Sequence, residues 1–92
     1  MIVRVLGVGQ FRLADDDLEI VQSADRQVEL AMDAGDEAAF GRALAHLTAE
    51  IGRVGTPVAI DEFVRSDVVV PDPDTTLAEA STFLADDGVI PG

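Results

Sequence analysis

The sequence predicts a small α+β domain spanning residues 1–92, and three observations support this class. A β-branched and aromatic stretch at the start is interrupted by two glycines, which is typical of a β-hairpin. Two longer segments then repeat apolar residues at steps of three and four, as amphipathic helices do. A compact valine run, Val68-Val69-Val70, predicts a further strand. Ninety-two residues suit one such domain and are too few for two.

The β-hairpin is expected within residues 1–13. Gly7 and Gly9 stand where the chain must reverse, and glycine readily adopts the positive φ that tight turns need. Alternate residues of a strand point to the same side, so one face should be core and the other solvated, with Arg4 and Arg12 on the solvated face. The core face would carry Val3, Val5, Phe11 and Leu13.

A helical hairpin is expected next. The first helix should run from Asp15 to a glycine cap at Gly35, because acids favour a first turn and glycine suits a left-handed C-cap. Asp36 should cap the second helix, which extends to about Val54. The stripe of the second helix that faces the sheet would comprise Phe40, Ala43, Leu44, Leu47, Ile51 and Val54.

The second helix also carries a row of small residues opposite its core stripe. Such a row lets another helix backbone approach closely. We expect the first helix to cover the row within the chain, and the alternative is coverage by a partner or a second subunit. Leu30, on the polar side of the first helix, is a further candidate for partner binding if it joins an apolar patch. The small-residue row comprises Ala38, Gly41, Ala45, Ala49 and Gly52.

The rest of the chain predicts a loop, the valine strand and a third helix. Residues from the end of the second helix to Ser66 have no clean period and are expected to form a loop with room for a short strand or turn. Thr76 and Glu79 match a capping box that opens a helix extending to about Asp86. The apolar tail, residues 89–92, is expected to pack on the core, with a terminal strand as the alternative.

Charge and composition exclude several functions. Eighteen acids against six bases give a net charge of -12, which repels nucleic-acid phosphate and anionic lipid, so no nucleic acid is expected as a partner. The chain has no cysteine, so it cannot form a disulfide, a thiolate zinc site or a cysteine nucleophile. No apolar run reaches the length of a membrane helix or a signal peptide, so we expect a cytoplasmic protein without direct membrane insertion.

No motif predicts catalysis. The single histidine, His46, is expected on the surface, and the chain offers no partners at the spacing of a triad or a zinc site. The acidic clusters match no calcium loop and are explained by helix capping and solvation. We therefore expect no catalytic residue, no cofactor and no metal, and a protein that is not an enzyme.

Five short segments together resemble a known family. They are mostly turns and caps, they occur in the same order as in the family, and from the first to the last they span nearly the whole chain. The sequence departs from the family at Val8, where an acid is frequent. The matching segments are MIVRVLGVGQF at residues 1–11, AGDE at 34–37, GTP at 55–57, SDVVVP at 66–71, and TLAE at 76–79 leading into DDGVIPG at 86–92. In these segments the chain resembles PspAA, the PspA-associated proteins.

The resemblance implies a small accessory protein of the phage-shock envelope-stress response that binds or tunes PspA, a coiled-coil membrane-remodelling protein. Membrane contact would then come through this PspA-like partner. The family offers no catalytic residues to carry over. Our hypothesis is that the helical hairpin docks on a PspA helix through Gly41, Ala45 and Ala49 if this row is free, with the acidic rim selecting the partner. The alternative is a self-associating structural subunit, a homo-oligomer without direct PspA contact.

Overall fold

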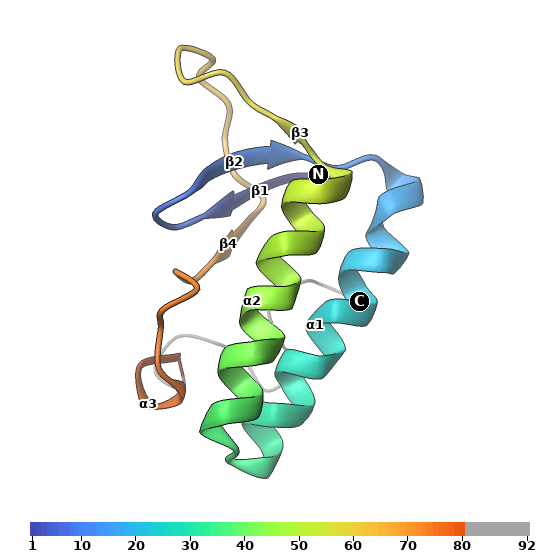
Figure 1. The fold of residues 1–92 in the computed structure, drawn as a ribbon. Helices are drawn as coiled ribbons and strands as arrows, with labels where there is room; N and C mark the ends of the chain where they lie inside the picture. The colour runs from blue at the N-terminus through green and yellow to red at the C-terminus, as the bar shows by residue number, and fades with distance from the viewer. Residues whose placement is uncertain (81–92) are drawn as a thin grey trace.

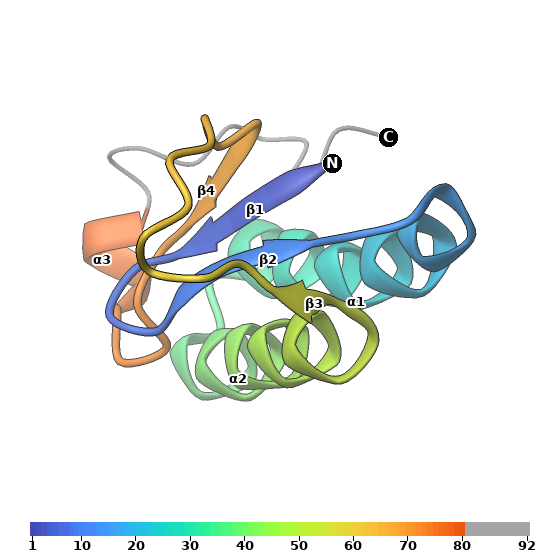
Figure 2. The same ribbon diagram turned by 90° about the horizontal axis from the view of Figure 1, so that it is seen from above.

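The computed structural model describes residues 1–80 and has two layers, a four-stranded sheet and a helical hairpin that covers one face of it (Figures 1 and 2). This is the α+β arrangement that the sequence predicts. Residues 81–92, on which the end of the third helix and the apolar tail were predicted, lie outside the described residues.

The predicted β-hairpin is confirmed. Strands β1 (Ile2–Val5) and β2 (Gly9–Arg12) pair antiparallel, with Val3 opposite Phe11. Gly7 takes a φ of 81° in the turn, a conformation that favours glycine. The predicted core face is buried, except that Phe11 is only half-buried.

The helical hairpin is confirmed as well. Helix α1 (Asp15–Ala34) ends at Gly35, whose φ is 66° and whose N–H donates to the carbonyl of Met32 at 3.1 Å. Helix α2 (Glu37–Val54) begins after Asp36, whose Oδ1 accepts from the backbone N–H of Ala39 at 3.0 Å. These two caps reverse the chain within a few residues and set the helices side by side, as Figure 1 shows.

The core fills the space between the helical hairpin and the sheet. Its residues are at most 8% exposed, and each helix contributes one apolar stripe. The sheet contributes Val3, Val5, Val68 and Val70, the residue after β2 contributes Leu13, α1 contributes Val21, Ala24, Val28 and Ala31, and α2 contributes Phe40, Ala43, Leu44, Leu47 and Ile51.

The sheet has the order β3-β2-β1-β4. Strand β3 (Thr56–Pro57) is the short strand for which the predicted loop left room, and it pairs antiparallel with β2. Strand β4 (Val68–Val70) pairs parallel with β1, with Val3 beside Val68. Since β3 and β4 occupy opposite edges, the chain must cross the whole sheet between them, over the face that the helices leave open (Figure 2).

Helix α3 (Leu77–Ala80) begins with the predicted capping box. The backbone N–H of Glu79 donates to Oγ1 of Thr76 at 3.2 Å, and the N–H of Thr76 donates to Oε1 of Glu79 at 3.2 Å. Ala80 is fully buried and joins the core.

One prediction about packing is wrong, because α1 does not cover the small-residue row. Gly41 is half-buried, and Ala45 and Ala49 are exposed. Helix α1 lies on the other flank of α2, beside Ala43 and His46. Small side chains allow a close approach there too, since Ala24 and Ala31 of α1 and Ala43 of α2 are all nearly buried at the junction.

Candidate interaction surfaces

A groove runs between α1 and α2 on the side of the helical hairpin away from the sheet. It consists of two adjoining hollows of about 740 and 450 Å³ that share Gln27 and His46. Exposed Ile20 lines the first hollow, and Leu30, 54% exposed, lines the second. The groove therefore combines a concave shape with two apolar side chains that a partner helix could cover.

Charges of both signs edge this groove. Asp16 and Glu19 line it near the start of α1, and Arg42 lines it near the start of α2. Arg53 donates from Nε to Oε2 of Glu50 at 3.1 Å. This hydrogen bond lowers the pKa of the Glu50 carboxyl below its ordinary value and raises the pKa of the Arg53 guanidinium. Glu50 and Arg53 thus line the first hollow as an ion pair.

The four predicted partner-binding residues fall on two separate surfaces. Leu30 lines the second hollow of the groove, beside Ala31 and Ala34. Gly41, Ala45 and Ala49 lie on the flank of α2 away from α1. His46 is exposed, as predicted, and lines both hollows of the groove.

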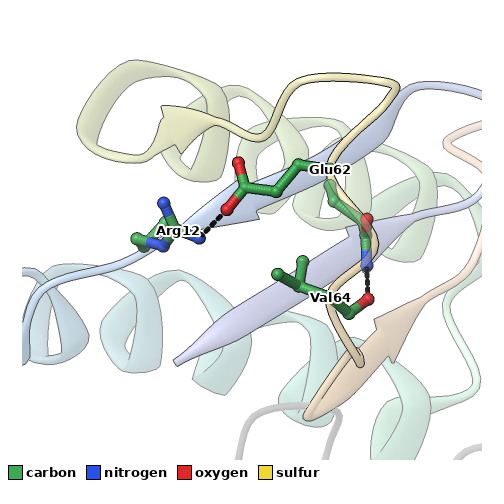
Figure 3. Close-up of polar contacts among 4 residues, drawn as sticks. Arg12, Glu62 and Val64 are labelled. Carbon is green, nitrogen blue, oxygen red and sulfur yellow. Dashed lines mark hydrogen bonds and ion pairs between the residues drawn. The ribbon is translucent and has the colours of Figure 1, made fainter.

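Sequence reasoning missed a second surface, which we call the outer face. It is the side of the sheet away from the helices together with the segment 58–67 that crosses it (Figure 2). Arg12 donates from Nη2 to Oε1 of Glu62 at 2.7 Å, and Nε2 of Gln10 donates to the carbonyl of Val64 at 3.1 Å (Figure 3). The same Nε2 donates to Oγ of Ser66 at 2.8 Å. These bonds attach the crossing segment to β2.

The crossing segment exposes two large apolar side chains. Ile60 and Phe63 are 102% and 98% exposed, although hydrogen bonds fix the backbone beside them. The segment has neither helical nor strand periodicity, so no pattern in it indicates which of its side chains face solvent. A buried acid, Asp25, was also missed. Asp25 lies four residues after Val21 and three before Val28, so helical geometry places it on the buried side of α1. This spacing could have predicted its burial.

Within residues 1–80, no three histidine, cysteine, aspartate or glutamate side chains lie close enough to hold a metal ion. None of the helices in the same range has the length and apolar character needed to cross a bilayer.

The fold and its surfaces define a class of protein: a small acidic α+β module that presents a grooved helical hairpin on one side and an apolar crossing segment on the other. Comparison with family models then identifies the family. The chain belongs to PspAA, the PspA-Associated protein family, whose model matches residues 1–92. Comparisons with curated proteins and with solved structures found no match.

Proposed function

We propose that this protein is a non-enzymatic accessory protein that binds a PspA-like coiled-coil protein and modulates it. Membership of the PspA-Associated family supports a PspA partner. The groove between α1 and α2 is the observation that carries the proposal, because helix-lined grooves commonly receive an amphipathic helix. A coiled-coil protein consists of such helices. The protein would work in the cytoplasm and reach the membrane through this partner.

The groove suits one helix of the partner. Ile20 and Leu30 are both on α1 and ten residues apart, about 15 Å along a helix, so they would contact one partner helix at two levels. Asp16 and Glu19 at one end favour a partner helix with basic residues there. Apolar contact would then supply affinity, and the acidic end would fix the direction of the partner helix.

The small-residue row remains a second proposed docking surface. Gly41, Ala45 and Ala49 let a helix backbone approach closely, and α1 leaves this flank of α2 exposed. The two surfaces lie on different flanks of α2. A bulky charged side chain introduced on one surface at a time therefore shows which of the two surfaces the partner helix contacts.

The test is co-elution with the PspA-like protein of the same genome, measured by size-exclusion chromatography with light scattering. Leu30→Arg should abolish the complex if the partner helix lies in the groove, and Ala45→Arg should abolish it if the helix lies on the small-residue row. Asp74→Arg, in the loop before α3, is the control, since Asp74 is exposed and lies on neither the helical hairpin nor the outer face. Circular dichroism confirms that each variant is folded. Co-elution that survives both helix variants would refute docking on the helical hairpin.

A self-associating structural subunit is the second candidate function. The observation that favours it is the exposed apolar pair on the outer face, far from the groove. If the protein forms a stable oligomer and ignores the PspA-like protein in the same experiment, this function replaces the first.

A further inference from the structure

The outer face concentrates the exposed apolar side chains of the described residues. Seven large apolar side chains are exposed within residues 1–80, and only two of them belong to the groove. A soluble monomer rarely gathers several such side chains on one side without a use for them. The other five lie on the outer face or in the hairpin turn at its end: Leu6, Val8, Ile60, Phe63 and Val69.

The outer face also contains a hollow. Its volume is about 450 Å³, and Val8, Val58 and Phe63 give it apolar walls. Arg4, from the central strand β1, lines it as well. Among the described residues no carboxylate lies within ion-pair distance of the Arg4 guanidinium. The exposed pair Ile60 and Phe63 is therefore part of the lining of this hollow, together with a cation that has no ion-pair partner among the described residues.

Charge distinguishes this face from the rest of the protein. It holds three of the six arginines, Arg4, Arg12 and Arg65, and only three acids, Asp61, Glu62 and Asp67. The rest of the sequence holds three arginines and fifteen acids. Two molecules of net charge -12 repel each other at most orientations, but these two balanced faces can approach each other without that cost. A basic partner would prefer the acidic remainder.

We propose that the outer face is a twofold contact between two copies of this chain. A twofold interface joins the same patch on both subunits, so the patch must be complementary to itself. This one is: Ile60 and Phe63 of each copy, which line the hollow beside Val8, would pack across the twofold axis against the same residues of the other copy. Arg4 of each copy would meet the acids of the opposite crossing segment, where Asp61 is exposed.

The test is the oligomeric state of the full chain, measured by sedimentation equilibrium from about 10 µM to 1 mM, a range in which weak to moderate dimers dissociate. The wild-type protein should form a reversible dimer. Ile60→Ser/Phe63→Ser should raise the dimer dissociation constant at least a hundredfold, since loss of each central anchor typically costs tenfold or more. Ile20→Ser/Leu30→Ser is the matched control because it removes the same chemistry from the groove, and it should leave the dimer unchanged.

The charge part of the proposal has its own variant. Arg4→Glu reverses the unpaired cation on an exposed side chain, so it should weaken the dimer without unfolding the protein. Both outer-face variants should still co-elute with the PspA-like protein, which separates this proposal from docking on the helical hairpin.

Three outcomes would overturn the twofold contact. The first is a wild-type protein that stays monomeric at 1 mM. The second is a dimer that survives Ile60→Ser/Phe63→Ser with an unchanged dissociation constant. The third is a monomeric wild-type protein whose co-elution with the PspA-like protein is lost in that variant, which would assign the outer face to PspA instead.

Discussion

Replacing three glycines with alanine should give changes in stability that differ in sign for reasons visible in the structure. Gly41 lies inside α2, and a Cβ added there would meet no atom of the described residues within 4 Å beyond its own helix. A Cβ added at Gly35 would also meet no atom of the described residues within 4 Å, but the φ of this residue is +66°, a conformation that residues with a side chain rarely adopt. Gly55 has an ordinary φ of -80°, but an added Cβ would lie 2.7 Å from the carbonyl oxygen of Ile51.

The magnitudes follow from these environments. Gly41→Ala should stabilise the protein by about 1 kcal/mol, the difference in helix propensity between the two residues. Gly35→Ala should destabilise it by about 1 kcal/mol. A left-handed conformation costs alanine about 1–2 kcal/mol in the folded protein, and the lower conformational entropy of the unfolded alanine variant offsets about half of that cost. Gly55→Ala should destabilise it by about 1–3 kcal/mol, since α2 must shift to relieve the clash.

Thermal and urea unfolding followed by circular dichroism measure all three effects. For a domain of this size, 1 kcal/mol corresponds to about 4–8 °C in Tm. Gly41→Ala should therefore melt above the wild-type protein, and the other two variants below it. A Gly41→Ala protein that melts lower, with its helix content intact, would refute the inferred open space beside α2. It would show that something covers the small-residue row.

Four further predictions concern the core, a cap, one ion pair and the net charge. Leu47→Ala should cost about 2–5 kcal/mol, because Leu47 is fully buried, and urea unfolding should show a lower midpoint. Asp36→Ala should lower the free energy of unfolding by about 1 kcal/mol through loss of the α2 cap, whereas Asp36→Asn should keep most of the stabilisation from that cap. The pKa of Glu50, measured by NMR titration, should lie below its ordinary value and return toward it in Arg53→Gln. The stabilisation from that bond is fully present above the pKa of Glu50 in the unfolded chain and is lost as pH falls through the lower pKa of the folded state, so a pH-independent difference between the wild-type and Arg53→Gln proteins would contradict it. Added salt should raise Tm by screening the self-repulsion of a net charge of -12, and a Tm that is flat from low to high salt would count against this account.

Local signals account for most of the fold that the sequence predicted. The Gly7 turn, the Gly35 cap and the Asp36 cap each depend on a few neighbouring residues, and all three are present in the structure. The core stripe of α2 follows from helical geometry alone. The resemblance to PspAA likewise rested on the order of such turns and caps, and the family model confirms it over residues 1–92.

The errors concern relations between distant segments. Helical geometry placed Ala45 opposite the core stripe, but it could not say on which flank of α2 the first helix would lie. Both flanks carry small residues, and the flank with Ala43 is the one that α1 occupies. The parallel pairing of β4 with β1 and the course of the crossing segment depend in the same way on contacts far apart in sequence. The exposure of Phe63 depends on the path of the crossing segment, and no pattern in the neighbouring residues predicts that path.

The position of β1 in the middle of the sheet has a consequence for the order of folding. Its neighbour β2 is formed by the next turn of the chain, but its other neighbour β4 is reached only after 65 residues, the separation of Ile2 and Asp67, which share a hydrogen bond of 2.7 Å. Loop closure over this distance makes that pairing slow compared with the two local hairpins. During synthesis, one edge of β1 therefore stays open until β4 has left the ribosome, and the chain must avoid pairing with a neighbour's strand in that interval.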